Sequence, residues 1–201
     1  MKEAPVCVAL ISDLHGNLLA LETVLADLER ERPDHVLCLG DAAATGPRPR
    51  ETVGRLRGVG CPVVMGNADD DLLRPTLELS LGSDRTLLCF HGSPRSFDDT
   101  IVATTPEEEL AGMLSEHEAA VMAGGHTHEQ FVRRHAGTTL INPGSVGLNP
   151  PVAEYALVDL EDGRLAVELR RLPLDAARIR REALDSGMPH AEWWAGFWGE
   201  N

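Results

Sequence analysis

Short runs of apolar and β-branched residues alternate with stretches of helical periodicity along the first half of the chain. Residues 6–11 and 35–39 have the composition of buried strands, and between them leucine recurs at positions 18, 21, 25 and 28, the spacing of one helix face. A helix-like segment at 50–57 then leads to a strand at 62–65, and the segment 70–79 leads to a strand at 86–90. The alternation predicts an α/β fold with parallel strands.

The next segment contains a helix start that can be recognised from its sequence. Thr105-Pro-Glu-Glu matches a capping box with proline at the first helical position, and it predicts a helix that runs to about His117. Residues 119–123 are apolar and predict a strand that leads into Gly124-Gly-His-Thr-His128.

Beyond this point the sequence pattern changes from α/β alternation to strands joined by turns. Residues 138–141, 154–160 and 164–169 are separated by Asn-Pro-Gly-Ser and Glu-Asp-Gly turns, which predicts an antiparallel meander and hence a second sheet. A charged helix is expected at 175–184. The chain closes with an aromatic cluster, for which a cap over the core or a homo-oligomer contact is the simplest role: Trp193, Trp194, Phe197 and Trp198.

Composition and charge narrow the class of protein. A length of 201 residues with 43% hydrophobic content predicts a single domain over residues 1–201, and the net charge of −14 argues against nucleic-acid and membrane partners. The first apolar run is too short for a signal sequence, and none approaches membrane-spanning length. Four cysteines without CxxC spacing lie in apolar runs, so we expect reduced thiols and a cytoplasmic location: Cys7, Cys38, Cys61 and Cys89.

Polar side chains gather at or just past the carboxyl ends of five of these apolar runs. They are Asp13, His15, Asp41, Asn67, His91, His126 and His128. In open α/β sheets ligands bind outside the carboxyl ends of the strands, so these residues can converge, and Asp, His and Asn are the ligands of borderline divalent metals. Each alone would be ordinary turn chemistry, but seven exceed what one ion needs and predict two ions about 3.5 to 4 Å apart. Glycines beside nearly all of them would let the backbone approach a crowded centre.

Six motifs in this order make the chain resemble the calcineurin-like metallophosphoesterases, in particular the small bacterial and archaeal phosphodiesterases. The motifs are Asp13-Leu-His15-Gly-Asn17, Leu39-Gly-Asp41, Gly66-Asn67, His91-Gly, Gly124-Gly-His126-Thr-His128 and Asn142-Pro-Gly-Ser-Val. The resemblance implies a four-layer αββα sandwich of two mixed β-sheets flanked by helices. It also implies a metal set in which Asp13, His15 and His128 hold one ion, Asn67, His91 and His126 hold the other, and Asp41 bridges them.

The same resemblance implies the hydrolysis of a small phosphodiester by in-line attack of a metal-bound hydroxide. Manganese is the expected metal, with iron, zinc and nickel as alternatives. Two divalent ions, two carboxylates and a hydroxide sum to +1, which attracts a singly charged diester despite the acidic chain. A phosphomonoesterase or nucleotide phosphatase of the same fold, and a metal-binding scaffold without turnover, are the alternative functions. A metallo-β-lactamase-like enzyme is disfavoured, because Glu-Gln-Phe follows His128.

Two positions near the motifs have open roles. Asn17 is either a helix N-cap or a contact to the substrate phosphate. Many relatives have histidine after the asparagine that corresponds to Asn67, and that histidine is taken to protonate the leaving oxygen. This chain has Ala68 there, followed by Asp69, so the general acid would have to be water or another residue unless the leaving group is good.

Overall fold

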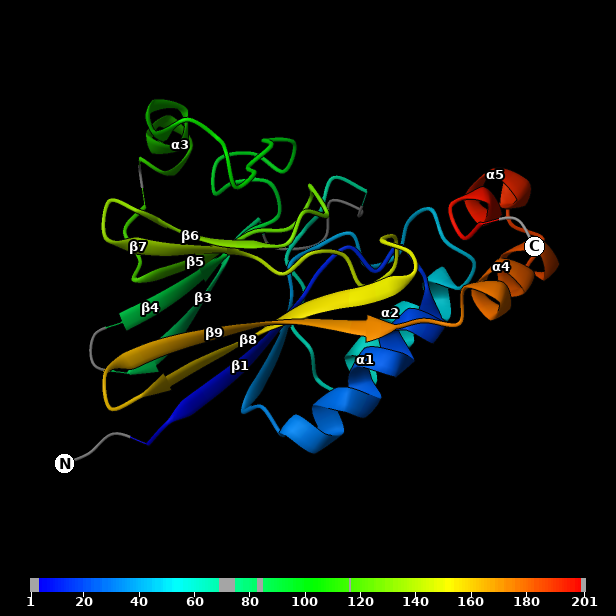
Figure 1. Cartoon of the computed structure of the whole chain (residues 1–201), viewed down its shortest axis with the longest axis horizontal. Coiled ribbons are helices and arrows are strands. Elements are labelled where there is room, and N and C mark those ends of the chain that lie inside the picture. The colour runs from blue at the N-terminus through cyan, green and yellow to red at the C-terminus, as the bar shows by residue number, and fades with distance from the viewer. Residues whose placement is uncertain (1–3, 69–74, 83–84, 116, 200–201) are drawn as a thin grey trace.

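Two β-sheets lie face to face, and helices cover the outer face of each (Figure 1). The computed structural model describes residues 4–68, 75–82, 85–115 and 117–199. The first sheet has the strand order β2-β1-β8-β9 and the second has the order β3-β4-β5-β7-β6. Both sheets are mixed, because β1 is parallel to β2 but antiparallel to β8, and β5 is parallel to β4 and β7 while β3 and β6 are antiparallel edges.

The strands of the first sheet are β1 Val6–Ile11, β2 His35–Cys38, β8 Val152–Glu161 and β9 Arg164–Pro173. Those of the second are β3 Leu77–Gly82, β4 Arg85–Cys89, β5 Val121–Ala123, β6 Phe131–His135 and β7 Thr138–Asn142. The helices are α1 Leu18–Glu31, α2 Pro49–Gly58, α3 Glu107–Leu114, α4 Ala176–Asp185 and α5 Ala191–Gly196.

Three apolar layers hold this architecture together. Val8 and Leu10 of β1 face Leu87 of β4 between the two sheets. The opposite face of β1 packs on α1 and α2, and the outer face of the second sheet packs on α3. Strands buried on both faces are apolar at successive positions rather than alternating, as the sequence Val-Cys-Val-Ala-Leu-Ile of β1 shows. The predicted αββα sandwich is confirmed.

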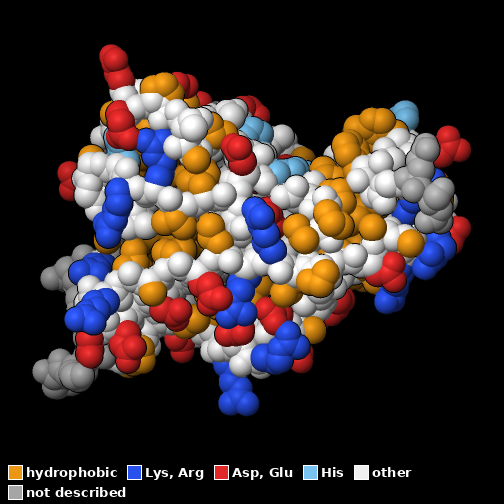
Figure 2. Space-filling model, in the orientation of Figure 1, with side chains coloured by type: hydrophobic (Ala, Val, Ile, Leu, Met, Phe, Trp, Pro, Cys, Tyr) orange, Lys and Arg blue, Asp and Glu red, His pale blue; other side chains and the backbone are white. Residues whose placement is uncertain are grey.

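A fourth apolar cluster joins the two C-terminal helices to the loops beside α1. Trp194 and Trp198 are buried in it with Ile179, whereas Trp193 and Phe197 are exposed and stack edge to face with ring centroids 4.9 Å apart. Figure 2 shows hydrophobic side chains gathered at the end of the molecule that holds these helices. The aromatic cluster is therefore divided, with one pair capping the core and the other facing outward.

Several predicted elements differ from the structure. Residues 62–65 do not form a strand, because Val63 makes only a single bridge to Cys38. Of the predicted connection at 70–79, residues 70–74 lie outside the described part, and the remainder enters β3, whose leucines alternate with polar residues as a half-buried strand requires. The predicted meander was also wrong in part, because β7 belongs to the second sheet while β8 and β9 form a hairpin in the first.

The expected capping box is another correction. Thr105 does not cap α3, because its hydroxyl accepts a hydrogen bond from the backbone N–H of Val102 at 2.9 Å; Pro106 occupies the N-cap position without a side-chain bond. The helix ends at Leu114, before the predicted His117. The strand β6 and the helix α5 were not predicted at all.

Two expectations about the class of protein can also be compared with the structure. All four cysteines are present as thiols. Over the described ranges, no helix is long and apolar enough to cross a membrane.

Candidate metal centre

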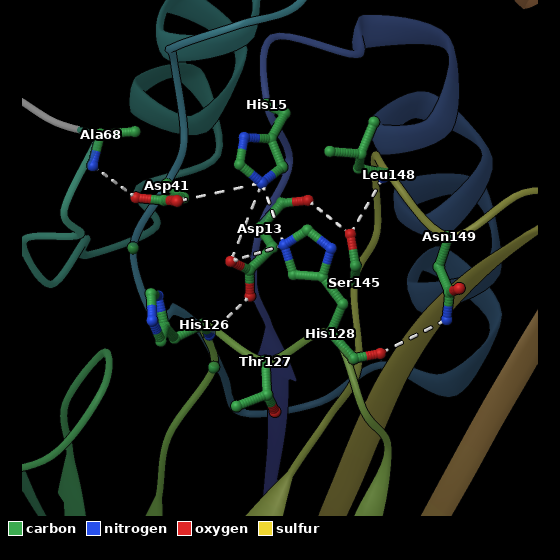
Figure 3. A network of polar contacts seen from close by, with 12 residues as sticks. Asp13, His15, Asp41, Ala68, His126, Thr127, His128, Ser145, Leu148 and Asn149 are labelled. Atoms are coloured by element: carbon green, nitrogen blue, oxygen red, sulfur yellow. Dashed lines mark hydrogen bonds and ion pairs between the residues drawn. The ribbon is translucent and has the colours of Figure 1, made fainter. Parts of the chain in front are cut away.

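The seven predicted ligands come together at one end of the sandwich, on the loops that follow β1, β2, residues 63–64, β4 and β5. Five of them have left-handed backbone conformations that non-glycine residues seldom adopt: Asp13, His15, Asp41, His126 and His128, with φ between 48° and 67°. Strained backbone of this kind is concentrated at functional sites, where the surrounding structure has to hold it in place. Figure 3 shows Asp13, His15 and His128 pointing toward one another, with Asp41 beside them.

Asp13 lies at the middle of this arrangement and is completely buried. Its Oδ2 accepts a hydrogen bond from the backbone N–H of His126 at 3.1 Å, but its Oδ1 has no hydrogen-bond partner in the described structure. Around that oxygen lie Nε2 of His128 at 3.3 Å, Nε2 of His15 at 3.9 Å and Nε2 of His91 at 4.0 Å. A buried carboxylate oxygen without a bond costs free energy unless a cation or a donor satisfies it.

Two groups of ligand atoms are close enough to hold an ion each. Asp13, His15 and His128 form one group, and Asp13, Asp41 and His91 form the other, with the ligand atoms of each group within 4.8 Å of one another. Asp41 also lies between the groups, since its Oδ1 is 3.5 Å from Nε2 of His91 and its Oδ2 is 3.9 Å from Nε2 of His15. Both carboxylates thus lie within reach of both groups.

Asn67 completes the second group. Its Oδ1 lies 2.9 Å from Nε2 of His91 and 3.0 Å from Nδ1 of His126, so one amide oxygen lies close to ring nitrogens of two histidines. Asn67 itself is exposed, which places it at the open side of the site. This position places a neutral amide oxygen beside the candidate ligands.

The outward-facing ring nitrogens show which atoms the imidazoles offer to the site. Nδ1 of His91 lies 2.8 Å from the carbonyl oxygen of Leu39, and Nδ1 of His15 lies 3.3 Å from that of Ala44. A carbonyl can only accept, so Nδ1 of His91 carries the proton and its Nε2 presents a lone pair, the arrangement found in metal-binding histidines. Nδ1 of His15 also lies 3.0 Å from the hydroxyl of Thr45, which can either donate or accept.

The two groups of donors fit divalent ions. Nε2 of His15 and Nε2 of His128 lie only 3.1 Å apart. Two lone pairs at that separation repel each other unless a proton or a cation lies between them. Because neighbouring nitrogens bound to one ion at about 2.1 Å lie about 3 Å apart, the spacing suits a shared metal. The unsatisfied Oδ1 of Asp13 faces the same space.

The pKa shifts favour the protonation states that bind metals. Burial acts to raise the pKa of Asp13, but the contact with His128 and the nearby charge of His91 outweigh it and hold the pKa below its usual value. Burial lowers the pKa of His15 and of His126, so both rings are neutral near pH 7. Burial would lower the pKa of His128 as well, but Asp13 raises it, so a proton there competes with a metal ion.

Two glycines permit the close approach of the backbone that this centre requires. A Cβ on Gly66 would lie 2.1 Å from Oδ1 of Asp41, and one on Gly125 would lie 2.0 Å from Oγ of Ser12 and 2.7 Å from Oδ2 of Asp13. No side chain fits at either position without moving a candidate ligand or its neighbour.

A loop at residues 142–149 forms hydrogen bonds to the backbone of the segments that carry the ligands. The sequence predicted no role for it beyond its resemblance to a family motif. The hydroxyl of Ser145 donates to the backbone carbonyl of Asp13 at 2.9 Å, and the backbone N–H of Gly147 donates to the same carbonyl at 3.0 Å (Figure 3). Asn142 donates to the carbonyl of Gly125 at 2.8 Å. The signal for this role was the density of hydrogen-bonding side chains in a turn between apolar strands.

The two positions with open roles lie close to the ligands. Asn17 is the N-cap of α1: its Oδ1 accepts from the N–H of Ala20 at 3.1 Å and its Nδ2 donates to Gly147 at 2.9 Å, so both polar atoms are used, and a contact to substrate stays a prediction. Ala68 is half-buried, and its backbone N–H donates to Oδ1 of Asp41 at 2.9 Å. Asp69 lies outside the described residues.

The sequence profile of the calcineurin-like phosphoesterase superfamily domain matches residues 7–163. This match spans every candidate ligand and most of both sheets, and the chain therefore belongs to that superfamily. Its members are metal-dependent phosphoesterases, and the centre described above provides the residues for such a site.

Individual proteins are also similar to this chain. An uncharacterized protein from Methanocaldococcus jannaschii is 41% identical over 66 residues, which cover 33% of this chain and 27% of the relative, so the aligned part spans about a quarter of the relative's length. Among solved structures, a metallophosphoesterase from Sphaerobacter thermophilus has a TM-score of 0.74 at 24% identity, covering 96% of this chain and 98% of its own. A hypothetical protein from Pyrococcus horikoshii has a TM-score of 0.81 at 16% identity, covering 96% and 97%. At these identities the two structures show a shared fold.

Proposed function

We propose that this chain is a dinuclear metal-dependent phosphoesterase that hydrolyses a small phosphodiester. The observation that carries the proposal is the fully buried Asp13, whose unpartnered Oδ1 faces three imidazole nitrogens at 3.3 to 4.0 Å. An arrangement of this kind is costly in a protein that binds no cation, because the carboxylate charge and the histidine lone pairs are concentrated in one small volume.

In this proposal Asp13, His15 and His128 hold one ion, Asn67, His91 and His126 hold the other, and Asp41 bridges the two. The separate orientation of the two oxygens of Asp41 supports the bridging role. The position of Asp13 in both groups supports a second shared carboxylate. When bound, two divalent ions would supply Lewis acidity and lower the pKa of an attacking water.

The protein's own contribution is to hold charge and dipoles in fixed positions. Asp13 and Asp41 are buried and contribute two negative charges, which two divalent ions exceed, so the site stays attractive to an anionic ester. The amino terminus of α1 begins beside His15 and adds a positive dipole end. The backbones of Gly66 and Gly125 pack directly against Asp41 and Asp13, which restricts the positions of the two carboxylates.

A diester is the proposed substrate because the site holds a moderate positive charge and Ala68 has no side chain that could donate a proton. A dianionic monoester would bind, but its alkoxide leaving group would depart slowly without such an acid. Manganese is the proposed metal, since mixed imidazole, carboxylate and amide donors accept it. The four thiols support a reducing, cytoplasmic location.

The test is a metal titration followed by a substrate panel. Protein stripped with chelator and reconstituted with saturating Mn²⁺ should contain two ions per chain, whereas one ion or none would overturn the dinuclear proposal. The panel compares an aryl diester with the matching aryl monoester and with an alkyl monoester. A preference for monoesters would replace the proposed phosphodiesterase by a phosphatase. Loss of activity on His128→Ala, with His135→Ala on β6 as the matched control, ties the turnover to this site.

A further inference from the structure

A buried carboxylate on β8 lies beneath the candidate metal centre and has no part in the proposed chemistry. Glu154 is 2% exposed, in a strand whose neighbouring positions are apolar. Its Oε2 accepts a hydrogen bond from Nδ2 of Asn149 at 2.7 Å, and its Oε1 forms an ion pair with Nε of Arg171 at 2.8 Å. A buried charge with two partners of this kind is fixed in position, because moving it would leave it unpaired.

The supporting loop at residues 142–149 is anchored to this carboxylate. The backbone N–H of Glu154 donates to the carbonyl of Ser145 at 3.0 Å, and Gly144 packs so closely that a Cβ there would lie 2.2 Å from Oε2 of Glu154. Gly144 has φ of +81°, a conformation that glycine adopts without strain. The position of the Glu154 carboxylate therefore limits where the loop at residues 142–149 can lie.

Through this loop the carboxylate is connected to two of the proposed ligands. Ser145 and Gly147 bond to the backbone carbonyl of Asp13, as described above. Nδ2 of Asn149 donates to the backbone carbonyl of His128 at 3.4 Å, and the backbone N–H of Leu148 donates to Oγ of Ser145 at 2.9 Å (Figure 3). Both ligands belong to the first group, and both have left-handed backbone that needs support.

Arg171 and Gln130 close the network on its outer side. Nε of Arg171 also donates to Oε1 of Gln130 at 3.2 Å, and Nε2 of Gln130 approaches the carbonyls of Pro143, Tyr155 and Arg170 at 3.1 to 3.2 Å. Gln130 follows His128 by two residues and so joins the histidine loop to both strands of the β8–β9 hairpin.

We infer that Glu154, held by Arg171, is a positioning residue that sets the first metal group by fixing the backbones of Asp13 and His128. The inference rests on the proposed function, because it assigns these groups to a metal. Supporting interactions around a metal site typically change metal affinity or activity by about 10- to 100-fold when they are removed.

The sequence of β9 provides a matched control. Arg170 is the neighbour of Arg171 and points to the other face of the strand, where its side chain pairs with Asp27, Glu31 and Glu168 and with no candidate ligand. Arg171→Met leaves the buried Glu154 without its cation, whereas Arg170→Met removes three ion pairs, none of them with a candidate ligand. Arg171→Lys retains the charge and should rescue part of the effect.

The experiment is calorimetric titration of chelator-treated protein with Mn²⁺, accompanied by thermal unfolding without metal. In Arg171→Met one of two binding events should weaken by about 10- to 100-fold while the other stays close to wild type, and Arg170→Met should leave both unchanged. Arg171→Lys should lie between wild type and Arg171→Met. Glu154→Gln, which keeps the shape but removes the charge, should weaken the same event.

The outcomes separate this inference from the proposed function. If wild-type protein binds no Mn²⁺, the proposed function fails before the variants are compared. If wild type binds two ions and Arg171→Met binds them as wild type does, or weakens both to the same extent as Arg170→Met, the positioning role is wrong while the dinuclear site stands. Unfolding temperatures of the two arginine variants in chelator show whether a general loss of stability explains the result.

Discussion

The methyl group missing at Gly125 gives a sharp test of how tightly the backbone is packed against the metal centre. Gly125→Ala adds one carbon atom, which would lie 2.0 Å from Oγ of Ser12 and 2.7 Å from Oδ2 of Asp13. Non-bonded heavy atoms prefer separations of about 3.5 to 4.0 Å, so backbone or side chains must move by about 1 Å or more. The glycine is not in the left-handed region, so the effect is steric rather than conformational.

The expected result depends on which groups have to move. Oδ2 of Asp13 accepts a hydrogen bond from the backbone N–H of His126, so movement of the backbone at Gly125 displaces a carboxylate and a histidine together. Overpacking of this kind costs about 1 to 3 kcal/mol of stability, and a misplacement of about 1 Å at a reacting centre can cost about 10²-fold in rate. We expect Mn²⁺ affinity and kcat/KM on an aryl diester to fall together by about that factor.

The assay compares Gly125→Ala with Gly112→Ala, because Gly112 lies in α3 and a Cβ there would meet nothing within 4 Å. Alanine in a helix interior is about 0.5 to 1 kcal/mol more stable than glycine, so this control should raise the unfolding temperature slightly and leave metal binding unchanged. Gly125→Ala that binds Mn²⁺ within twofold of wild type would refute the reasoning, since the centre would then tolerate a displacement that the packing forbids.

Three further predictions concern the candidate ligands and the substrate. Asp41→Asn should reduce activity and metal content far more than Asn17→Ala, which should cost about 1 kcal/mol in a thermal melt because a helix cap is lost; equal and mild losses would exclude the bridging role of Asp41. Aryl diesters should be hydrolysed faster than alkyl monoesters with each metal tried, and steady-state rates with the reverse order would contradict the proposed substrate. Ala68→His should accelerate esters with poor leaving groups selectively, by about 10² at most, while aryl esters barely respond; a native enzyme whose rate is already insensitive to leaving-group pKa would show that another group supplies the proton.

Local sequence signals were sufficient for the helices and strands whose hydrophobic pattern lies within the element itself. The apolar run at residues 6–11 gives β1, and the leucine spacing gives the start of α1 at Leu18, although the helix continues to Glu31, past the last of these leucines. The charged helix expected at 175–184 is α4, which has Asp175 as its N-cap. The convergence of the seven polar residues also followed from the sequence, because the carboxyl ends of parallel strands meet at one edge.

Other features depend on partners distant in the chain and so could not be read locally. Thr105 has the right neighbours for a cap, yet its hydroxyl bonds to Val102 instead. The assignment of β7 to the second sheet depends on its parallel pairing with β5, which no turn signal reports. Glu154 resembles an ordinary charged residue in a strand until Arg171 and Asn149 are placed beside it.

The left-handed backbone of the five ligand residues has a consequence for how this site can change over time. An L-residue in that region costs roughly 1 to 2 kcal/mol relative to the right-handed one, less for Asp and His than for most, while a whole domain is stable by only about 5 to 15 kcal/mol. Glycine would relieve this strain at each of these positions. Stability and metal binding are therefore opposed at these residues, and a lineage released from the need for the chemistry would gain folding free energy by losing the ligands. Aspartate and histidine at all five left-handed positions therefore hold a conformation that glycine would adopt at a lower cost in folding free energy.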